Sequence, residues 1–305
     1  MEIKQLEIFV SVAKNLSFSK AAEELYLSQS SVSIGVGALE KSLGVQLLAR
    51  NSKGVSLTKA GLDLLSYAKE ILSLRAHAFH NASGKDCVAE GAIDIISSTI
   101  PSQHLLPEII SSFKKQWRNV LFRITQADSH GVTQALRGFQ YDFGMVGTIP
   151  DGERFVHYPI YDDELVLVAP GCAAESSEMT QNDFATYITR MPLIMREQGS
   201  GTRTEMEALF SKLGVEPRAL SITAYLPDTH GILLAVSRGL GVSLVSKVAA
   251  TMYERADMLK IIEVNSPLFR RQIHLLHNKE LRLSPLQQAF ADYARSFYCG
   301  NGTTE

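Results

Sequence analysis

The chain of 305 residues has few cysteines, no long apolar run and no strong excess of charge of either sign. Cys87, Cys172 and Cys299 have neither the density of a disulfide scaffold nor the spacing of a zinc site, so free thiols are expected. No segment is apolar over the roughly 18 residues that a membrane helix needs, and the polar start does not resemble a signal peptide. We therefore expect a cytoplasmic protein with no membrane partner.

Groups arranged for catalysis are also absent. The histidines show no pairing with a nucleophile at a recognisable turn, and the run Gly199 to Thr202 lacks the lysine of a phosphate-binding loop. His77 and His80 alone do not make a metal site. We expect no enzyme, no cofactor and no bound metal. The hydrophobic content of 45% instead predicts a small domain joined to a larger one with its own core.

The most informative segment runs from Ser28 to Gly44, where a polar helix start precedes apolar residues at helical spacing. Ser28 is a candidate N-cap, and the early turns would present polar side chains to base edges in the major groove. The apolar residues predicted to pack inward are Val32, Val36, Leu39 and Leu43. The residues predicted to contact DNA from this helix are Ser28, Gln29, Ser30, Ser31, Ser33, Ile34 and Lys41.

Two shorter helices precede this one, and a two-stranded wing follows it around the turn Lys53-Gly54. Together they predict a winged helix-turn-helix DNA-binding domain in residues 1–58. Ser17, Arg50 and Lys53 complete the predicted DNA contacts. The alternative is a generic three-helix bundle, which leaves the polar half of the third helix without a use.

Residues 58–81 read as one amphipathic helix about 36 Å long. Its length favours pairing with a second copy, although a helix packed on its own chain is the alternative. We assign residues 59–86 to a linker and dimerisation helix with a hinge at its end.

As a joint pattern, residues 1–61 resemble the DNA-binding domain of the LysR-type transcriptional regulators. The matching residues are Leu6, Phe9, Ala13, Ser17, Phe18, Ala21, Ala22, Leu25, Ser28, Gln29, Ser30, Val32, Ser33, Leu39, Glu40, Leu43, Gly44, Leu47, Arg50, Leu57, Thr58 and Gly61. The resemblance implies a transcriptional regulator that binds double-stranded promoter DNA as a dimer or tetramer, with RNA polymerase as a further partner.

One departure keeps a second hypothesis open. The family usually carries basic or amide side chains where this chain has Ile34, Gly35 and Gly37. Glycines inside a helix cost about 1 kcal/mol each relative to alanine, and missing cations remove phosphate contacts. The alternative function is therefore a metabolite-binding sensor with weakened or lost DNA binding. Against it, an outward Ile34 could contact a thymine methyl group.

From Gly91 onward, apolar runs alternate with helical patterns, which predicts α/β structure with a mostly parallel sheet. The predicted strands include Val120–Gln126, Glu164–Ala169, Pro192–Arg196 and Leu259–Val264. The family resemblance extends here and implies a two-lobed domain like a periplasmic binding protein in residues 87–305. Lobe I would comprise about residues 91–161 and 267–298, and lobe II about residues 162–266. Polypeptide crossings between the lobes would lie near 158–163 and 264–268.

A ligand in such a fold should lie between the lobes, where strands end and helix N-termini present free N–H groups. Hydroxyl-rich loops meet there, and Arg203 could bind a carboxylate with both guanidinium nitrogens. This predicts a small anionic effector that alters lobe closure. The alternatives are ordinary helix caps and, for Arg203, a salt bridge. The predicted effector residues are Ser98, Thr99, Ile100, Gln103, Gln126, Thr148, Gly199, Ser200, Gly201, Thr202, Arg203 and Asp228.

Overall fold

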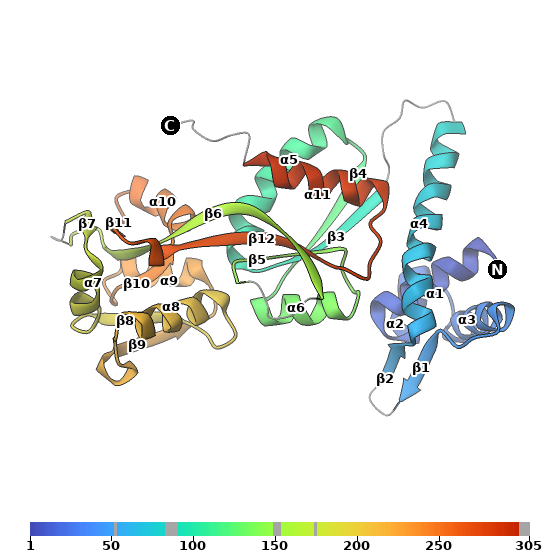
Figure 1. The fold of residues 1–305 in the computed structure, drawn as a ribbon, viewed down its shortest axis with the longest axis horizontal. Helices are drawn as coiled ribbons and strands as arrows, with labels where there is room; N and C mark the ends of the chain where they lie inside the picture. Colours follow the sequence, from blue (N-terminus) through green and yellow to red (C-terminus); the bar gives the residue numbers. More distant parts are fainter. Residues whose placement is uncertain (52–53, 83–90, 149–153, 174–175, 299–305) are drawn as a thin grey trace.

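The structure, a computed structural model, describes residues 1–51, 54–82, 91–148, 154–173 and 176–298. A helical N-terminal unit lies at one end of an elongated molecule, and two α/β lobes follow along the long axis (Figure 1). No helix among the described residues is both long enough and apolar enough to span a bilayer.

The N-terminal unit is a winged helix-turn-helix. Its elements are α1 (Ile3–Asn15), α2 (Phe18–Leu25), α3 (Gln29–Leu43), β1 (Leu48–Asn51), β2 (Gly54–Leu57) and α4 (Lys59–Ala82). Side-chain caps fix two of the helix starts: Ser17 accepts a hydrogen bond from the Lys20 amide at 3.3 Å, and Ser28 accepts one from the Ser31 amide at 3.1 Å. The strands β1 and β2 pair antiparallel and form the wing.

The inward face of α3 differs from the prediction at one residue. Val32, Val36 and Leu39 are at most 2% exposed and pack with α1 and α2. Leu43 is 39% exposed, so its predicted burial is wrong. It lies in the last turn, just before Gly44 at a φ of +73° ends the helix, and the packed face stops short of that turn.

Lobe I is a sheet with helices on both faces. Its elements are β3 (Gly91–Ser97), a π-helical turn (Pro101–Leu105), α5 (Leu106–Gln116), β4 (Val120–Gln126), α6 (Ser129–Arg137), β5 (Phe143–Val146), β12 (Arg270–Asn278) and α11 (Pro285–Phe297). The sheet order is β4-β3-β5-β12-β6, with β3 parallel to β4 and β5. Aromatic rings of Phe113, Phe143 and Phe290 pack in its core.

The long strand β6 (Phe155–Pro170) belongs to both lobes. It pairs with β12 over Phe155–Glu164 and with β10 and β11 over Leu165–Pro170. The sequence predicts a crossing segment near 158–163 and a separate strand after it. The structure instead has one continuous strand, β6, over both. Figure 1 shows β6 and β12 running side by side between the lobes.

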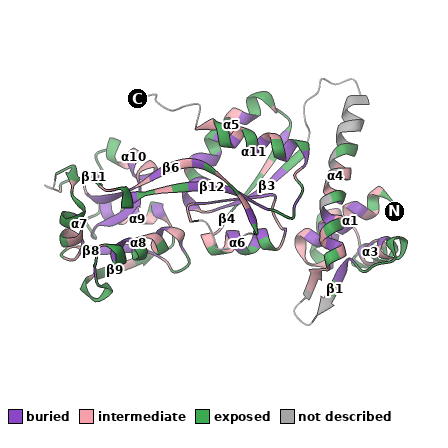
Figure 2. Ribbon diagram, in the orientation of Figure 1, coloured by how far each residue is buried: buried purple, intermediate pink, exposed green. Residues whose placement is uncertain are grey.

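Lobe II completes the fold. Its further elements are β7 (Glu178–Met179), α7 (Gln181–Ile188), β8 (Pro192–Arg196), α8 (Gly201–Lys212), a 3-10 turn (Pro217–Ala219), β9 (Ser221–Leu226), α9 (Thr229–Ser237), β10 (Ser243–Ser246), α10 (Lys247–Arg255), β11 (Leu259–Val264) and a second 3-10 turn (Pro267–Phe269). The strands β8, β10 and β11 are mostly buried, whereas β7 and β9 have no buried residue and the helices present exposed outer faces (Figure 2).

The N-terminal unit contacts lobe I. Phe139, 7% exposed, packs into the N-terminal core, and Lys69 of α4 pairs with Asp142 at 3.0 Å. Lys14 of α1 pairs with Asp94 at 3.3 Å. Burial alone would raise the pKa of Asp94. The pKa instead lies below its ordinary value, because Arg123 and Lys14 stabilise the carboxylate.

Candidate functional site

The outward face of α3 carries the residues predicted to read DNA. Gln29, Ser30, Ser31 and Lys41 are exposed, and Ile34 is 71% exposed (Figure 2). Ser33 is half-buried. The Ser28 hydroxyl caps the helix and also contacts the hydroxyls of Ser30 and Ser31 at 2.8 Å each, so it organises the helix start.

Other predicted DNA contacts are placed only in part. Ser17 caps α2, on the helix that precedes α3. Lys53 and the side chain of Arg50 lie outside the described residues, as do the side chains of His77 and His80.

The two glycines of α3 differ in their surroundings. A Cβ at Gly35 would lie 2.7 Å from Cδ1 of Ile8, so the glycine lets α3 approach α1. A Cβ at Gly37 would meet no atom within 4 Å. Only Gly35 therefore has a packing reason for the missing side chain.

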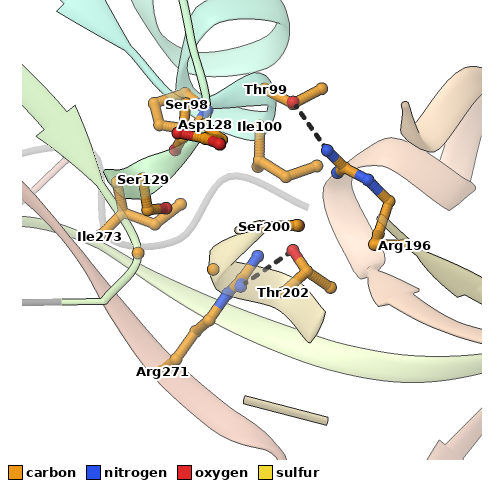
Figure 3. Close-up of a pocket in the computed structure, with 13 residues that line it drawn as sticks. Ser98, Thr99, Ile100, Asp128, Ser129, Arg196, Ser200, Thr202, Arg271 and Ile273 are labelled. Atoms are coloured by element: carbon orange, nitrogen blue, oxygen red, sulfur yellow. Dashed lines mark hydrogen bonds between the residues drawn. The ribbon is translucent and has the colours of Figure 1, made fainter. Parts of the chain in front are cut away.

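A small cavity of about 20 Å³ lies between the lobes (Figure 3). Six of the predicted effector residues line it: Ser98, Thr99, Ile100, Ser200, Gly201 and Thr202. Two further lining residues, Arg271 and Ile273, lie outside the loops predicted to form the site. The others lie in those loops but were not among the predicted contacts; they are Pro101, Asp128, Ser129, Gly147 and Arg196.

Strand ends and helix starts position these groups. β3 ends at Ser97, and the chain turns at Ser98 and Thr99 into the π-helical turn and α5. β8 ends at Arg196, and α8 begins at Gly201 after the N-cap Ser200. The carboxyl ends of parallel strands thus meet helix N-termini, whose free N–H groups favour negative charge.

Arg196 lies on the lobe II side of the cavity, with its side chain 5% exposed. It donates to both carboxylate oxygens of Glu197, at 2.8 Å and 2.9 Å, and to the carbonyl of Pro227 at 3.1 Å. A longer bond of 3.4 Å reaches the Thr99 hydroxyl in lobe I. The guanidinium is therefore fixed in place at the boundary between the lobes.

Arg271 approaches the cavity from the start of β12, as Figure 3 shows. Its Nε donates to Asp163 at 2.8 Å, and its Nη1 donates to Glu205 at 2.5 Å and to the Thr202 hydroxyl at 3.4 Å. Burial alone would lower its pKa, but the Glu205 and Asp163 carboxylates raise the pKa above the ordinary value. Arg271 is thus a permanent buried cation.

Three donors at the cavity are not engaged by the part of the protein that the structure describes. The Nη2 group of Arg271 donates no hydrogen bond there, and the hydroxyls of Ser129 and Ser200 contact no protein partner. Ser200 is only 3% exposed. These groups can therefore bind a ligand without first giving up a hydrogen bond to the described protein.

Arg203 does not line this cavity, although it was predicted to contact the effector together with the residues that do. Its Nε donates to Glu207 at 2.8 Å, and its guanidinium carbon lies 4.8 Å from the centre of the Tyr225 ring. It lines a separate groove on lobe II. Since α8 begins at Gly201, the third residue of the helix faces away from lobe I.

Several other predicted residues also lie beside the cavity rather than on its wall. Asp228 caps α9 by accepting from the Gly231 amide at 2.7 Å. Gln103 and Gln126 are exposed and contact each other at 3.4 Å. Thr148 donates to Glu205 at 2.7 Å, and Gly199 lies against Asp128.

Local sequence features mark some of the lining residues that were not among the predicted contacts. Asp128 and Ser129 follow a strand and open a helix, and Arg196 is the charged end of an apolar strand. No local pattern marks Arg271, because its neighbours at the cavity come from α8 and β6, far away in the chain.

Comparison with known proteins identifies the family. Residues 3–62 match the family model of bacterial regulatory helix-turn-helix proteins of the lysR family, and residues 88–298 match the LysR substrate binding domain. The chain belongs to the LysR family. It is therefore a LysR-type DNA-binding transcriptional regulator with an effector-binding domain.

Relatives align along nearly the whole LysR-type chain. A helix-turn-helix transcriptional regulator of Methanocaldococcus jannaschii is 32% identical over 96% of this chain and 98% of its own length. The RuBisCO operon transcriptional regulator of Allochromatium vinosum is 30% identical, with 97% and 96% covered. Full-length OxyR from Pseudomonas aeruginosa has the same fold, with a TM-score of 0.67 at 19% identity over 97% of this chain and 98% of that chain. The curated relatives are named as transcriptional regulators, which agrees with a non-enzymatic role.

Proposed function

We propose that this LysR-type regulator controls transcription in response to a small anionic effector that binds in the cavity between its lobes. Residues 1–58 would read the DNA, residues 59–86 would link and dimerise the chains, and residues 87–305 would sense the effector. The main support for an anionic effector is the buried Arg271. Its Nη2 lies at the same cavity as the hydroxyls of Ser129 and Ser200, which have no hydrogen-bond partner in the described protein.

Charge balance explains what the anion would contact. The two carboxylates of Asp163 and Glu205 more than balance the single charge of Arg271, and Glu197 balances that of Arg196. The donors left over are therefore N–H and O–H groups rather than a free excess of positive charge. Such groups, together with the start of α8, favour an oxyanion that accepts several hydrogen bonds.

The test is a titration of the full chain with sodium salts of sulfate, phosphate, acetate and bicarbonate at constant ionic strength. We expect at least one anion to raise the melting temperature with saturation, because a ligand that binds only the folded state stabilises it. Ser200→Ala should weaken this binding roughly tenfold, as loss of a hydrogen bond to a charged group predicts. Ser237→Ala is the matched control, since that hydroxyl lies on α9 and bonds only the Leu234 carbonyl. Equal binding by both variants would contradict the assignment.

The second part of the proposal is that α3 reads the major groove. Gln29, Ser30, Ser31 and Ile34 are exposed along its first half, which is where a recognition helix presents its contacts. We expect the full chain to prefer the DNA upstream of its own gene over scrambled DNA of equal length, with Gln29→Ala reducing that preference. Loss of binding to both DNAs as salt rises would instead support a metabolite sensor with weakened DNA reading. The exposed Ile34, where a cation is usual, is the observation that favours this alternative.

Self-association through α4 is supported by apolar side chains that its own chain leaves exposed. Tyr67 is 53% exposed and Leu74 is 66% exposed, seven residues apart and thus on one face of the helix. We expect a second copy to cover them, in a dimer or a tetramer, and Leu74→Glu to shift sedimentation toward the monomer. Lys59→Glu, on an exposed position of the same helix, is the control. RNA polymerase remains a proposed partner of the assembled regulator.

A further inference from the structure

Besides the bonds that Arg271 of β12 makes to Thr202 and Glu205 of α8, two hydrogen bonds join the lobes across the edge of the cavity. Thr148, which follows β5 of lobe I, donates to Oε1 of Glu205 on α8 of lobe II at 2.7 Å. On the other side, Arg196 at the end of β8 donates to the Thr99 hydroxyl of lobe I at 3.4 Å. The other carboxylate oxygen of Glu205 accepts from Arg271, so the acceptor of the shorter bond is held rigidly. We refer to Thr148–Glu205 and Thr99–Arg196 as the latch.

Gly199 in the loop before α8 and Gly201 at the first position of α8 allow the lobes to come this close. A Cβ at Gly201 would lie 2.5 Å from the Ser129 hydroxyl and 3.2 Å from that of Thr148. A Cβ at Gly199 would lie 2.7 Å from Oδ2 of Asp128. All three neighbours belong to lobe I, so side chains at these positions would push the lobes apart.

The space left between the lobes is too small for an anionic effector of several heavy atoms. The cavity of about 20 Å³ has room for about one water molecule. Its walls come from both lobes, so moving one wall means moving one lobe (Figure 3). An effector can therefore enter only if the latch opens.

We infer that the latch is a regulatory device that holds the lobes in a closed form that excludes the effector, so that effector binding and latch opening are coupled. The identity of the ligand in this inference rests on the proposed function. The closed form of the lobes does not depend on that proposal. The apparent affinity then equals the intrinsic affinity multiplied by the fraction of open molecules. Weakening the latch must strengthen effector binding, even where the changed residue does not line the cavity.

Thr148 offers the sharpest test, because it contacts Glu205 and does not line the cavity. Thr148→Val removes the donor and keeps the branched shape. Gly201→Val is a second, steric way to open the latch. Thr204→Val is the matched control, since Thr204 lies on α8 next to Glu205 but its hydroxyl bonds only the Ser200 carbonyl of its own lobe.

The separation of the lobes can be measured directly by pulsed electron spin resonance on the full chain. Spin labels at Gln134 on α6 and Ala208 on α8 occupy exposed positions in lobe I and lobe II. The native cysteines Cys87, Cys172 and Cys299 are changed to serine in every variant. Circular dichroism and melting curves establish that each labelled protein is folded.

Without added anion, we expect one short distance in the parent protein and in Thr204→Val. Thr148→Val should raise the ratio of long to short distances roughly tenfold, the effect of losing a hydrogen bond to a carboxylate. Gly201→Val should give mostly the long distance. A long distance in the parent protein, or no change in folded Thr148→Val and Gly201→Val, would overturn the inference.

Sulfate serves as the probe for coupling. If it binds, its dissociation constant should be several-fold lower for Thr148→Val than for Thr204→Val, and sulfate should lengthen the distance in the parent protein. An equal dissociation constant in the two variants would overturn the coupling. If sulfate binds neither variant but the distances change as expected, the results support the closed form held by the latch. They then count against an anionic effector at this site.

Discussion

Gly61 lies where α4 begins and passes close to the chain at Leu47. A Cβ at this position would lie 2.1 Å from the Leu47 carbonyl oxygen, a backbone atom that cannot rotate away. Gly37 on α3 has no atom within 4 Å of the corresponding position. The two helical glycines therefore differ. Gly61 allows α4 to pack against Leu47, whereas Gly37 has no neighbour that a side chain would meet.

This difference predicts opposite effects of the same substitution. Gly37→Ala should raise the free energy of unfolding by about 0.5–1 kcal/mol, because alanine has the higher helix propensity. Gly61→Ala should lower it by about 2 kcal/mol or more, because α4 must move off Leu47. Urea unfolding followed by circular dichroism measures both. A gain in stability for Gly61→Ala would show that this contact is not tight in solution.

Residue chemistry predicts part of the candidate site and misplaces the rest. Hydroxyls directly after strand ends, such as Ser98 and Thr99, were predictable because a strand end followed by a helix start has a fixed geometry. Arg203 was misplaced because a shift of one helical position turns a side chain to another face. Arg271 reaches the cavity only through the pairing of β12 with β6, which no local pattern reveals.

The crossing strands β6 and β12 carry a pair of histidines at an irregular place in the ladder. The register shifts between Ile273 and His274, and the His274 ring lies 5.7 Å from that of His157. Nδ1 of His274 is buried without a hydrogen-bond partner among the described residues. Burial, with the nearby His157, lowers the pKa of His274 from its ordinary value of 6.5, so the folded chain keeps this ring neutral.

A lowered histidine pKa makes stability depend on pH in a definite direction. As pH falls below about 6.5, the unfolded chain binds the proton before the folded chain does, so folding stability falls. His274→Leu should reduce the loss of unfolding free energy between about pH 7.5 and about pH 5.5, measured by urea titration. His130→Leu, at an exposed position on α6, should leave that loss unchanged. An unaltered pH dependence in His274→Leu would contradict the assignment.

At the level of elements, the sequence predicted strands better than short helices. Val120–Gln126, Pro192–Arg196 and Leu259–Val264 were predicted with the bounds that the structure shows, because each is an apolar run between polar or turn residues. The helices α7 and α10 were missed. Each buries only two residues, Phe184 and Ile188 in α7 and two alanines in α10, so the helical period of apolar residues is weak.

At the scale of the whole molecule, one of the ion pairs between the N-terminal unit and lobe I involves a buried carboxylate. The Asp142 side chain is only 6% exposed and accepts from Lys69 of α4. Its second oxygen accepts from the Asp94 amide, which fixes the carboxylate in lobe I. Lys69 supplies the cation that this buried carboxylate needs.

Removing that cation should weaken the whole chain. Lys69→Met leaves Asp142 buried without its partner, and we expect a loss of about 2 kcal/mol in the free energy of unfolding. Differential scanning calorimetry should also separate the N-terminal unit from the lobes as an earlier transition. Lys59→Met removes a lysine from an exposed position of the same helix and should have little effect. A melting curve of Lys69→Met identical to that of the parent chain would rule out this coupling.

The packing of Phe139 on the N-terminal core has a consequence for anyone who isolates the lobes. Its ring is 7% exposed only because another domain covers it, and its backbone has a φ of +56°. In a fragment cut within the linker, this apolar ring would be exposed to water and would favour aggregation. Phe139→Asn would remove the ring and suit the left-handed backbone. That change should keep such a fragment monodisperse for crystallisation and ligand screening.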